Sequence, residues 1–312
     1  MSSEKPQFEA FWKGEQSKSA GKKKEKDSAQ REIEEREQQE REEAELKVKS
    51  IELAKGVQEA FANNDLGQAL EKLQQLEKLA SPEARLDFRE AREILEKDFI
   101  GPEAVEKTWG IKLTPEEASQ IENIPFSREE LEQAKALGMM LVLRVPHDKE
   151  GKPLSIDRMR EVMQGEDKLG DPTKKKNKIF YYKKGEAWHD KEKFSLEDTT
   201  KLGWGLAAKA VLPESLSKNW DQQEEVLKEW AKKNGIDPNS VRRRTPTEVV
   251  YDTITYYGAN KESLLERTWD WSAVQLSDGN FVYAGLFDSD GLRVDGVSRG
   301  SSGSDLGVCP AR

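Results

Sequence analysis

The spacing of apolar residues predicts that the first part of the chain is helical. Residues 28–62 read as one long helix, highly charged at first, whose apolar positions begin at Val48. Residues 66–79 carry a second apolar stripe at helical spacing, and the Asn- and Gly-containing segment 63–67 between them is typical of a turn. These two stretches predict an antiparallel helical hairpin.

Capping signals predict further helices up to Gly138. Ser81 followed by Pro82 starts one helix, because Ser is a favoured N-cap and Pro is tolerated at the first helical position. Thr114-Pro-Glu-Glu and Ser127-Arg-Glu-Glu130 start two short helices in the same way, and the second of them is a capping box. Gly138 ends the last of these helices.

After Gly138 the pattern becomes mixed. The predicted elements are strands at 139–145 and 179–182 and helices at 155–163, 204–211, 220–233 and 245–258. We therefore expect a domain boundary near Gly138. The expected organisation is a flexible charged tail at 1–27, a helical arm at 28–138, and a second domain at 139–312.

The last stretch of the chain predicts a three-stranded antiparallel meander. Two Asp-Gly pairs, at 278–279 and 290–291, lie between apolar runs, and Asp-Gly tolerates the positive φ angles of a tight hairpin turn. Strict alternation along the middle strand places Phe281, Tyr283 and Phe287 on one face. With helices before this meander, the predicted fold class is α+β.

Composition restricts the partners. The chain of 312 residues has a net charge of −9, with 36% charged residues, so its overall charge favours neither nucleic acid nor an anionic membrane. The N-terminus lacks the apolar core of a secretion signal, and no apolar run is long enough to span a membrane. We expect a cytoplasmic protein; display on a virion or surface stays open. The aromatic cluster Phe8, Phe11 and Trp12 in the tail could dock on a partner or fold back on this protein.

Candidate chemistry is sparse, and the sequence predicts no catalytic residue, metal site or cofactor. The lone Cys309 is expected to be buried, and His147 and His189 lie in different predicted loops and are expected at the surface. Asp288-Ser-Asp290-Gly291 begins like a calcium loop but lacks the later Glu, so a plain turn is favoured. Two basic runs complete the candidates: 174–178 is favoured as a solvated loop over a nucleic-acid contact, and 242–244 could hold an anion or pair with carboxylates.

The order of motifs at the chain end carries a resemblance to a known family. Trp269-Asp-Trp271-Ser272 is followed by the Asp-Gly hairpin, a short strand, a Ser/Gly loop and the terminal run 306–312, Leu-Gly-Val-Cys-Pro-Ala-Arg. This order resembles the end of a C-type lectin fold, in the branch shared by formylglycine-generating-enzyme-like domains and the variable proteins of diversity-generating retroelements. The resemblance covers roughly the last 45 residues, with a weaker similarity at 202–209.

The resemblance implies a non-enzymatic binding protein. Formylglycine-generating activity in the family uses a pair of cysteines, which a chain with Cys309 alone cannot form. The variable proteins imply a diversifiable surface within 268–312 that binds a protein or another macromolecule. Residues expected to pack are Trp269, Trp271, Phe281, Phe287, Leu292 and Val308. Residues expected to face the ligand are Gln275, Ser277, Asp278, Asn280, Tyr283, Asp288, Ser289, Arg293, Asp295, Ser298, Arg299, Ser301, Ser302, Ser304 and Asp305.

Two other functions stay open at this point. One is a structural or assembly protein whose helical arm binds a partner or self-associates and whose second domain is a fixed connector. The other is an enzyme of unassigned chemistry. The gene neighbourhood separates the diversifiable binding protein from the fixed connector, because only a diversified protein needs a reverse transcriptase and a template copy.

Overall fold

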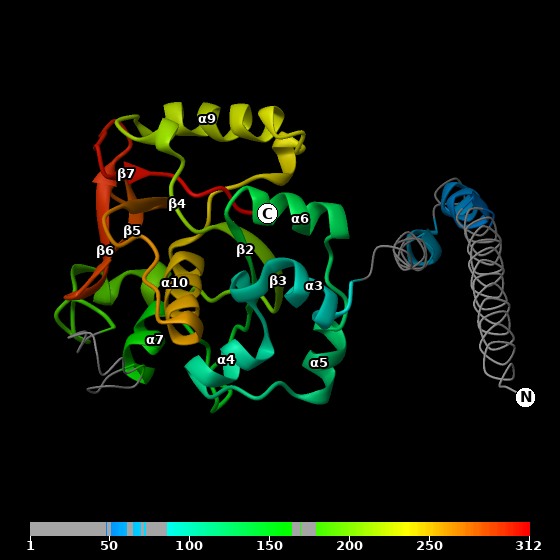
Figure 1. Cartoon of the computed structure of the whole chain (residues 1–312), viewed down its shortest axis with the longest axis horizontal. Helices are drawn as coiled ribbons and strands as arrows, with labels where there is room; N and C mark the ends of the chain where they lie inside the picture. Colours follow the sequence, from blue (N-terminus) through cyan, green and yellow to red (C-terminus); the bar gives the residue numbers. More distant parts are fainter. Residues whose placement is uncertain are drawn as a thin grey trace, which may run out of the picture. The chain divides into compact units, whose positions relative to one another are not determined.

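The computed structural model of the chain describes residues 48, 51–60, 65–69, 72, 86–163, 169 and 179–312. The chain divides into two units, Met1–Glu83 and Ala84–Arg312 (Figure 1). In the first unit, residues 51–60 and 66–69 are helical, and Lys72 lies beside Gly56. The expected tail with its aromatic cluster, the Ser81 cap and the basic run 174–178 lie outside the described residues. Among the described residues, no helix is both long and apolar enough to cross a bilayer.

The second unit opens with short capped helices. The α-helices are α3 (Phe88–Leu95), α4 (Pro102–Trp109), α5 (Pro115–Ile121) and α6 (Arg128–Ala136), with a 3-10 turn η1 (Glu96–Asp98) after α3. Thr114 and Ser127 each accept a hydrogen bond from the backbone N–H three residues on, and the Glu at that position bonds back to the cap. The predicted capping box at Ser127 is therefore confirmed, and Thr114, predicted to start a helix, forms one as well. Asp87 caps α3 in the same way.

A three-stranded sheet forms the centre of this unit, in the order β1 (Phe99–Ile100), β2 (Met139–Arg144), β3 (Gly203–Ala208). β1 runs parallel to β2, and β3 runs antiparallel to it. The helix predicted at 204–211 is wrong, because those residues lie largely in β3. The reason is non-local. At the edge of β3 that does not pair with β2, Leu206 exchanges two backbone hydrogen bonds with Arg312, at 3.1 and 2.9 Å.

The boundary expected at Gly138 does not separate two units. Leu95, Ile100 and Val105 lie in one buried cluster together with the residues of β2. Trp109 stacks on Tyr251 with ring centroids 5.5 Å apart. The helices from α3 to α6 therefore belong to the same core as the rest of residues 84–312, and the division falls between Glu83 and Ala84.

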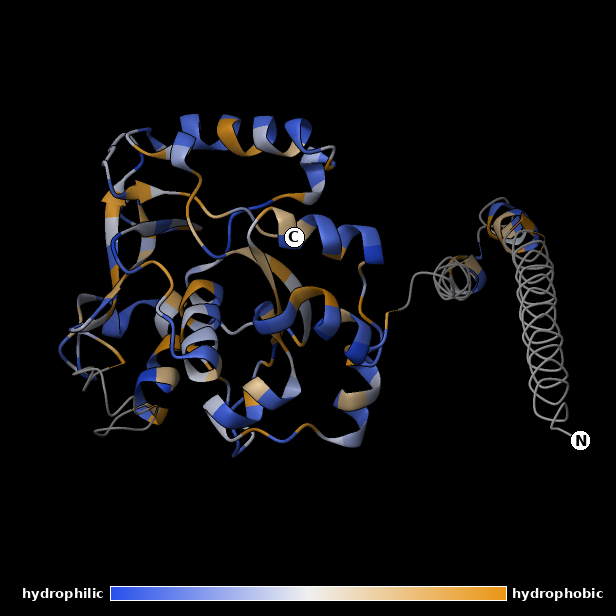
Figure 2. Cartoon of the chain, viewed as in Figure 1, coloured by the Kyte–Doolittle hydropathy of each residue, from blue (hydrophilic) through white to orange (hydrophobic). Residues whose placement is uncertain are grey.

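The later helices pack around and between the sheets. They are α7 (Ile156–Val162), α8 (Lys193–Leu196), α9 (Trp220–Lys233) and α10 (Pro246–Asn260), with 3-10 turns η2 (Trp188–Lys191), η3 (Pro213–Ser215) and η4 (Pro238–Ser240). α10 is buried over most of its length and contacts α4, β2 and β5. α9 is mainly hydrophilic (Figure 2). The strand predicted at 179–182 reduces to a single bridge between Phe180 and Leu292.

The C-terminal sheet has the order β6 (Gly291–Ser298), β5 (Asn280–Asp288), β4 (Trp269–Gln275), β7 (Leu306–Gly307). Its first three strands form the predicted antiparallel meander, and β7 adds in parallel to β4. Gly279 and Gly291 have φ angles of +88° and +106°, as the two Asp-Gly turns require. The molecule is thus α+β.

A bulge near the end of β5 breaks the strict alternation. The register of β5 against β6 shifts between Gly285 and Asp288, where Leu286 has a φ of +45°. Phe281 packs with Trp271, whereas Phe287 packs on α10 in the main core. The prediction that Phe281 and Phe287 share a face is therefore wrong.

Candidate functional site

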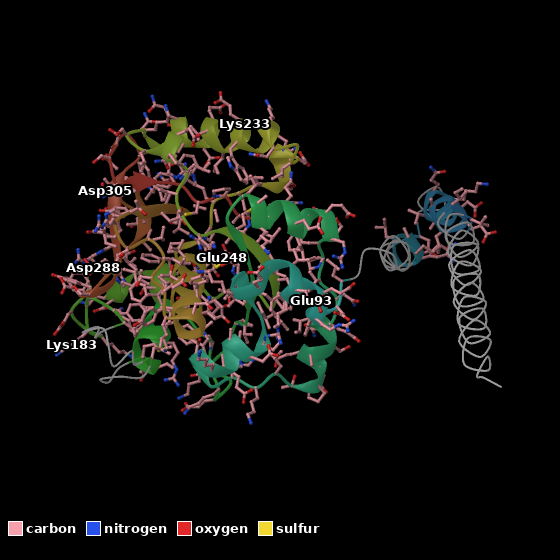
Figure 3. The ribbon with its side chains drawn as sticks, in the orientation of Figure 1. Glu93, Lys183, Lys233, Glu248, Asp288 and Asp305 are labelled. Atoms are coloured by element: carbon pink, nitrogen blue, oxygen red, sulfur yellow. The ribbon has the colours of Figure 1, made fainter. Side chains whose placement is uncertain are left out.

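The residues expected to face a ligand are all at least partly exposed. Of the fifteen, none falls in the buried class. The residues expected to pack behave in the opposite way, because five are buried and only Trp269 is half-buried. In Figure 3, Asp288 and Asp305 lie at the periphery of the second unit, while Glu248 lies inside it. The residues expected to pack and those expected to face a ligand are thus separated by burial.

The structure distributes these residues over two ends and the middle of the sheet. Asn280 is the register partner of Ser298, which brings the β4–β5 turn next to the loop that follows β6. The β5–β6 turn with Asp288 lies at the other end. At about 3.3 Å per residue, the length of β5 separates the two ends by roughly 25 Å. Grouped by position, the first end holds Gln275, Ser277, Asp278, Asn280, Ser298, Arg299, Ser301, Ser302 and Ser304, the other end holds Asp288, Ser289 and Arg293, and the middle holds Tyr283, Asp295 and Asp305.

The middle group lies on one face of the sheet. Trp271, Tyr283 and Asp295 are register neighbours on β4, β5 and β6. Trp269 meets Tyr283 edge to face, with ring centroids 4.6 Å apart, and its backbone N–H donates to the carbonyl of Asp305. Burial raises the pKa of Tyr283 to about 12, and the carboxylates of Asp295 and Asp305 add to the shift. We call Trp269, Tyr283, Asp295 and Asp305 the aromatic–acidic face.

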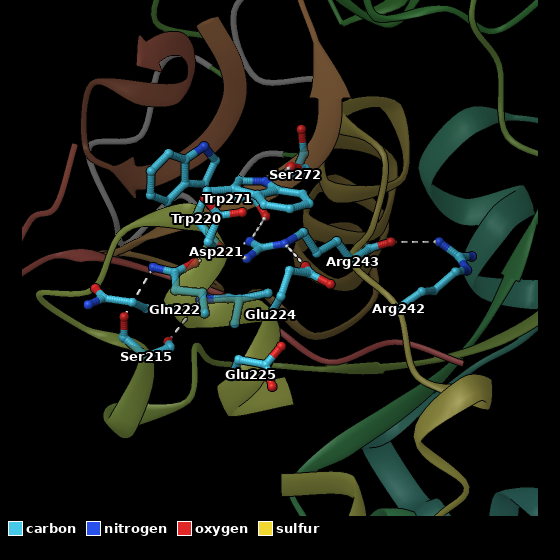
Figure 4. Close-up of polar contacts among 12 residues, drawn as sticks. Ser215, Trp220, Asp221, Gln222, Glu224, Glu225, Arg242, Arg243, Trp271 and Ser272 are labelled. Carbon is cyan, nitrogen blue, oxygen red and sulfur yellow. Dashed lines mark hydrogen bonds and ion pairs between the residues drawn. The ribbon is translucent and has the colours of Figure 1, made fainter. Parts of the chain in front are cut away.

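Helix α9 begins on the same face and is held there by Arg243 (Figure 4). The ring centroids of Trp220 and Phe281 lie 4.9 Å apart. The buried guanidinium of Arg243 lies 4.4 Å from the Trp220 ring and donates to the carbonyls of Trp271 and Trp220 at 2.8 and 2.9 Å. Glu224 pairs with the same guanidinium. Arg243 thus ties α9 to β4.

Arg299 is engaged by the protein rather than free. Its guanidinium lies 5.0 Å from the Trp220 ring and 5.8 Å from that of Phe281. It also forms an ion pair with Asp221 at the start of α9. Arg299 is exposed, as predicted, but a ligand would have to compete with Asp221 for it.

A second arginine is occupied at the β5–β6 turn. Arg293 donates to Asp288 at 3.2 Å and to Asp290 at 3.4 Å, and its guanidinium lies 4.4 Å from the Tyr181 ring. The backbone N–H of Asp290 also donates to Asp288 at 2.8 Å. The two carboxylates that suggested a calcium loop are therefore hydrogen-bonded within a turn. Among the described residues, no group of three or more His, Cys, Asp or Glu is placed to hold a metal ion.

A buried charge network joins the C-terminal sheet to the first sheet. Asp252 of α10 accepts from Arg144 of β2 at 2.9 and 2.7 Å and from Arg244 at 3.0 Å. Arg244 also donates to Asp270 of β4 at 3.0 and 2.8 Å. Burial opposes ionisation of Glu248, yet Arg242 and Arg144 lower its pKa to about 2. Of the two roles open for 242–244, pairing with carboxylates is the observed one.

Cys309, His189 and Ser195 are all buried. Cys309 is buried, as predicted, and burial raises the pKa of its thiol. The surface position expected for His189 is wrong: the ring is buried 3.0 Å from the hydroxyl of Ser195, and burial, with Arg160 nearby, lowers its pKa to about 4. Ser195 is also fully buried. The half-buried His147 bonds to Glu117 at 2.5 Å.

The sequence did not reveal the contribution of Trp220 and Arg243 to this surface. Both precede residues 268–312 by more than twenty residues, so only the tertiary structure brings them to β4. The available signal was an aromatic residue directly after the Asn219 cap of α9. Comparisons of the chain with protein-family models, with curated proteins and with solved structures found no match.

Proposed function

We propose that the chain is a non-enzymatic ligand-binding protein. In this proposal a C-type lectin-like scaffold within residues 84–312 displays a diversifiable surface, formed by residues 268–312, to a protein partner. The observation that carries it is the separation of roles along the meander. Large apolar residues such as Trp271 and Phe281 are buried, while the fifteen polar residues expected to face a ligand all reach solvent.

The support beneath the surface favours tolerance to substitution. The scaffold is held by Arg243, by the buried pairs of Asp252 and by the aromatic packing of Trp220. These contacts are made by residues outside the Ser-rich loop, although Arg299 of that loop also lies against the Trp220 ring. Exposed substitutions usually change the free energy of unfolding by less than about 0.5 kcal/mol. The loop and the β4–β5 turn can therefore vary while the fold persists.

A randomised library tests this proposal. The positions are exposed and cluster at one end of the sheet: Gln275, Ser277, Asp278, Ser298, Ser302 and Ser304. We expect most members to unfold cooperatively near the parent melting temperature and to yield binders when panned against unrelated proteins. A matched control library randomises exposed positions of α9 at Gln222, Glu225, Lys228, Glu229, Lys232 and Lys233. A mostly unfolded meander library, or equal numbers of binders from both libraries, contradicts the proposal.

The gene neighbourhood provides a second test. A diversified protein requires a reverse transcriptase gene and a near-copy of the segment that encodes residues 268–312, differing mainly at adenines. Absence of both from the native locus would support a fixed connector instead.

A further inference from the structure

The aromatic–acidic face carries negative charge that no described residue neutralises through an ion pair. Asp295 and Asp305 are exposed, and neither forms an ion pair with a described residue. In contrast, the nearby Asp221 and Asp288 pair with Arg299 and Arg293. Burial, followed by the carboxylates of Asp295 and Asp305, raises the pKa of the Tyr283 phenol. The face is therefore an electrostatic site for a positive group.

The aromatic rings on the face determine which positive group fits. A ring attracts a cation placed over its π-system, and this attraction adds to that of a neighbouring carboxylate. Trp269 and Tyr283 provide two half-buried rings between β7 and β6, flanked by Asp305 on one side and Asp295 on the other. A guanidinium or ammonium on a long apolar stem can contact ring and carboxylate together.

We propose that the aromatic–acidic face binds a lysine or arginine side chain presented by a protein partner. This inference rests on the proposed function, since it names the kind of partner that the surface receives. The cation enters between Tyr283 and the two carboxylates, where its charge is neutralised and its stem packs on Trp269.

Charge-neutral variants test the inference in the full chain. The probes are an alternating Gly–Lys octapeptide and its Gly–Glu counterpart, titrated at low ionic strength and followed by calorimetry. We expect binding of the Gly–Lys peptide only, and at least about a fivefold rise in its Kd in the double variant D295N/D305N. The matched control is E116Q/E229Q, which removes the same net charge at exposed positions of α5 and α9. An equal rise in Kd for both pairs would mean non-specific attraction and overturn the inference.

Two further variants separate the components of the face. Tyr283→Leu keeps both carboxylates but removes the ring, and we expect it to weaken the Gly–Lys complex while Ser302→Ala does not. The pKa of the Tyr283 phenol, followed by NMR with ring-labelled tyrosine, should fall in D295N/D305N because two neighbouring negative charges are lost. An unchanged phenol pKa contradicts the charge arrangement itself.

The outcomes distinguish this inference from the proposed function. A library that folds and yields binders, combined with no effect of D295N/D305N, retains the diversifiable surface and rejects the basic partner. If D295N/D305N loses Gly–Lys binding while the control E116Q/E229Q keeps it, and the library is mostly unfolded, the cation site is retained and diversification is rejected.

Discussion

The fragment of residues 139–312, which composition marks as a domain, should not fold by itself. The structure places helices α3 to α6 and strand β1 in the same core as β2 and α10. Removing residues 84–138 would expose one edge of β2, whose six residues are all buried. It would also remove the contacts between α4 and α10.

The magnitude follows from the burial of the removed side chains. Eight large apolar residues of the removed segment are at most 3% exposed: Leu95, Ile100, Val105, Trp109, Ile111, Ile121, Ile124 and Leu131. Burying such a side chain contributes about 1.5–3 kcal/mol, so the set contributes on the order of 12–24 kcal/mol. Even half of that value is comparable to the whole stability of a typical domain, about 5–15 kcal/mol.

The assay compares the fragments 84–312 and 139–312 with the full chain. We expect 84–312 to show a cooperative urea transition and dispersed amide NMR signals, and 139–312 to be unfolded, molten or aggregated through the free edge of β2. The first unit is absent from both fragments, so it cannot explain a difference between them. A cooperative transition of 139–312 with native-like dispersion would refute this account of the core.

Three substitutions test other parts of the structure. Trp271→Ala should cost about 3–5 kcal/mol of unfolding free energy and Ser302→Ala less than about 0.5, measured by urea denaturation; similar values would reverse the assignment of packed and displayed residues. Asp252→Asn should cost about 3–5 kcal/mol because two buried arginines lose their carboxylate, whereas the exposed Asp278→Asn should have little effect. Burial opposes the charge on the His147 ring, but the hydrogen bonds of the ring raise its pKa above the ordinary 6.5. The charged ring therefore stabilises the fold fully below pH 6.5, and this stabilisation is lost as the pH rises through the raised pKa. The melting temperature of His147→Gln should therefore fall below that of the parent by more at about pH 5.5 than at about pH 9, and a gap independent of pH contradicts the assignment.

Local signals predicted most helices correctly. The caps Thr114, Ser127 and Thr245 bond to groups three residues away, so the sequence segment contains the whole interaction. The two Asp-Gly turns are equally local, because positive φ at Gly279 and Gly291 depends on the residue type alone. Elements of this kind can be recognised without knowledge of the fold.

Non-local pairing explains the errors in secondary structure. Residues 203–208 form a strand because β2 and the last residues of the chain supply hydrogen-bond partners on both sides. A short Gly- and Ala-rich run has no periodicity that distinguishes strand from helix. The bulge at Gly285 likewise places Phe287 on the opposite face of β5 from Phe281. There Phe287 packs against Tyr257 of α10.

For the residues singled out in the meander, the sequence by itself indicated which are buried and which reach solvent, because residue type favours one or the other locally. It did not indicate the burial of Asp270 and Ser272. Only the tertiary structure decided which exposed residues are free. Arg293 and Arg299 are occupied by Tyr181, Trp220 and nearby aspartates, while Asp295 and Asp305 have no ion-pair partner among the described residues. The physical reason is that the contacts of Arg299 with Trp220 and Asp221, and of Arg293 with Tyr181, join residues distant in sequence, which no local pattern specifies.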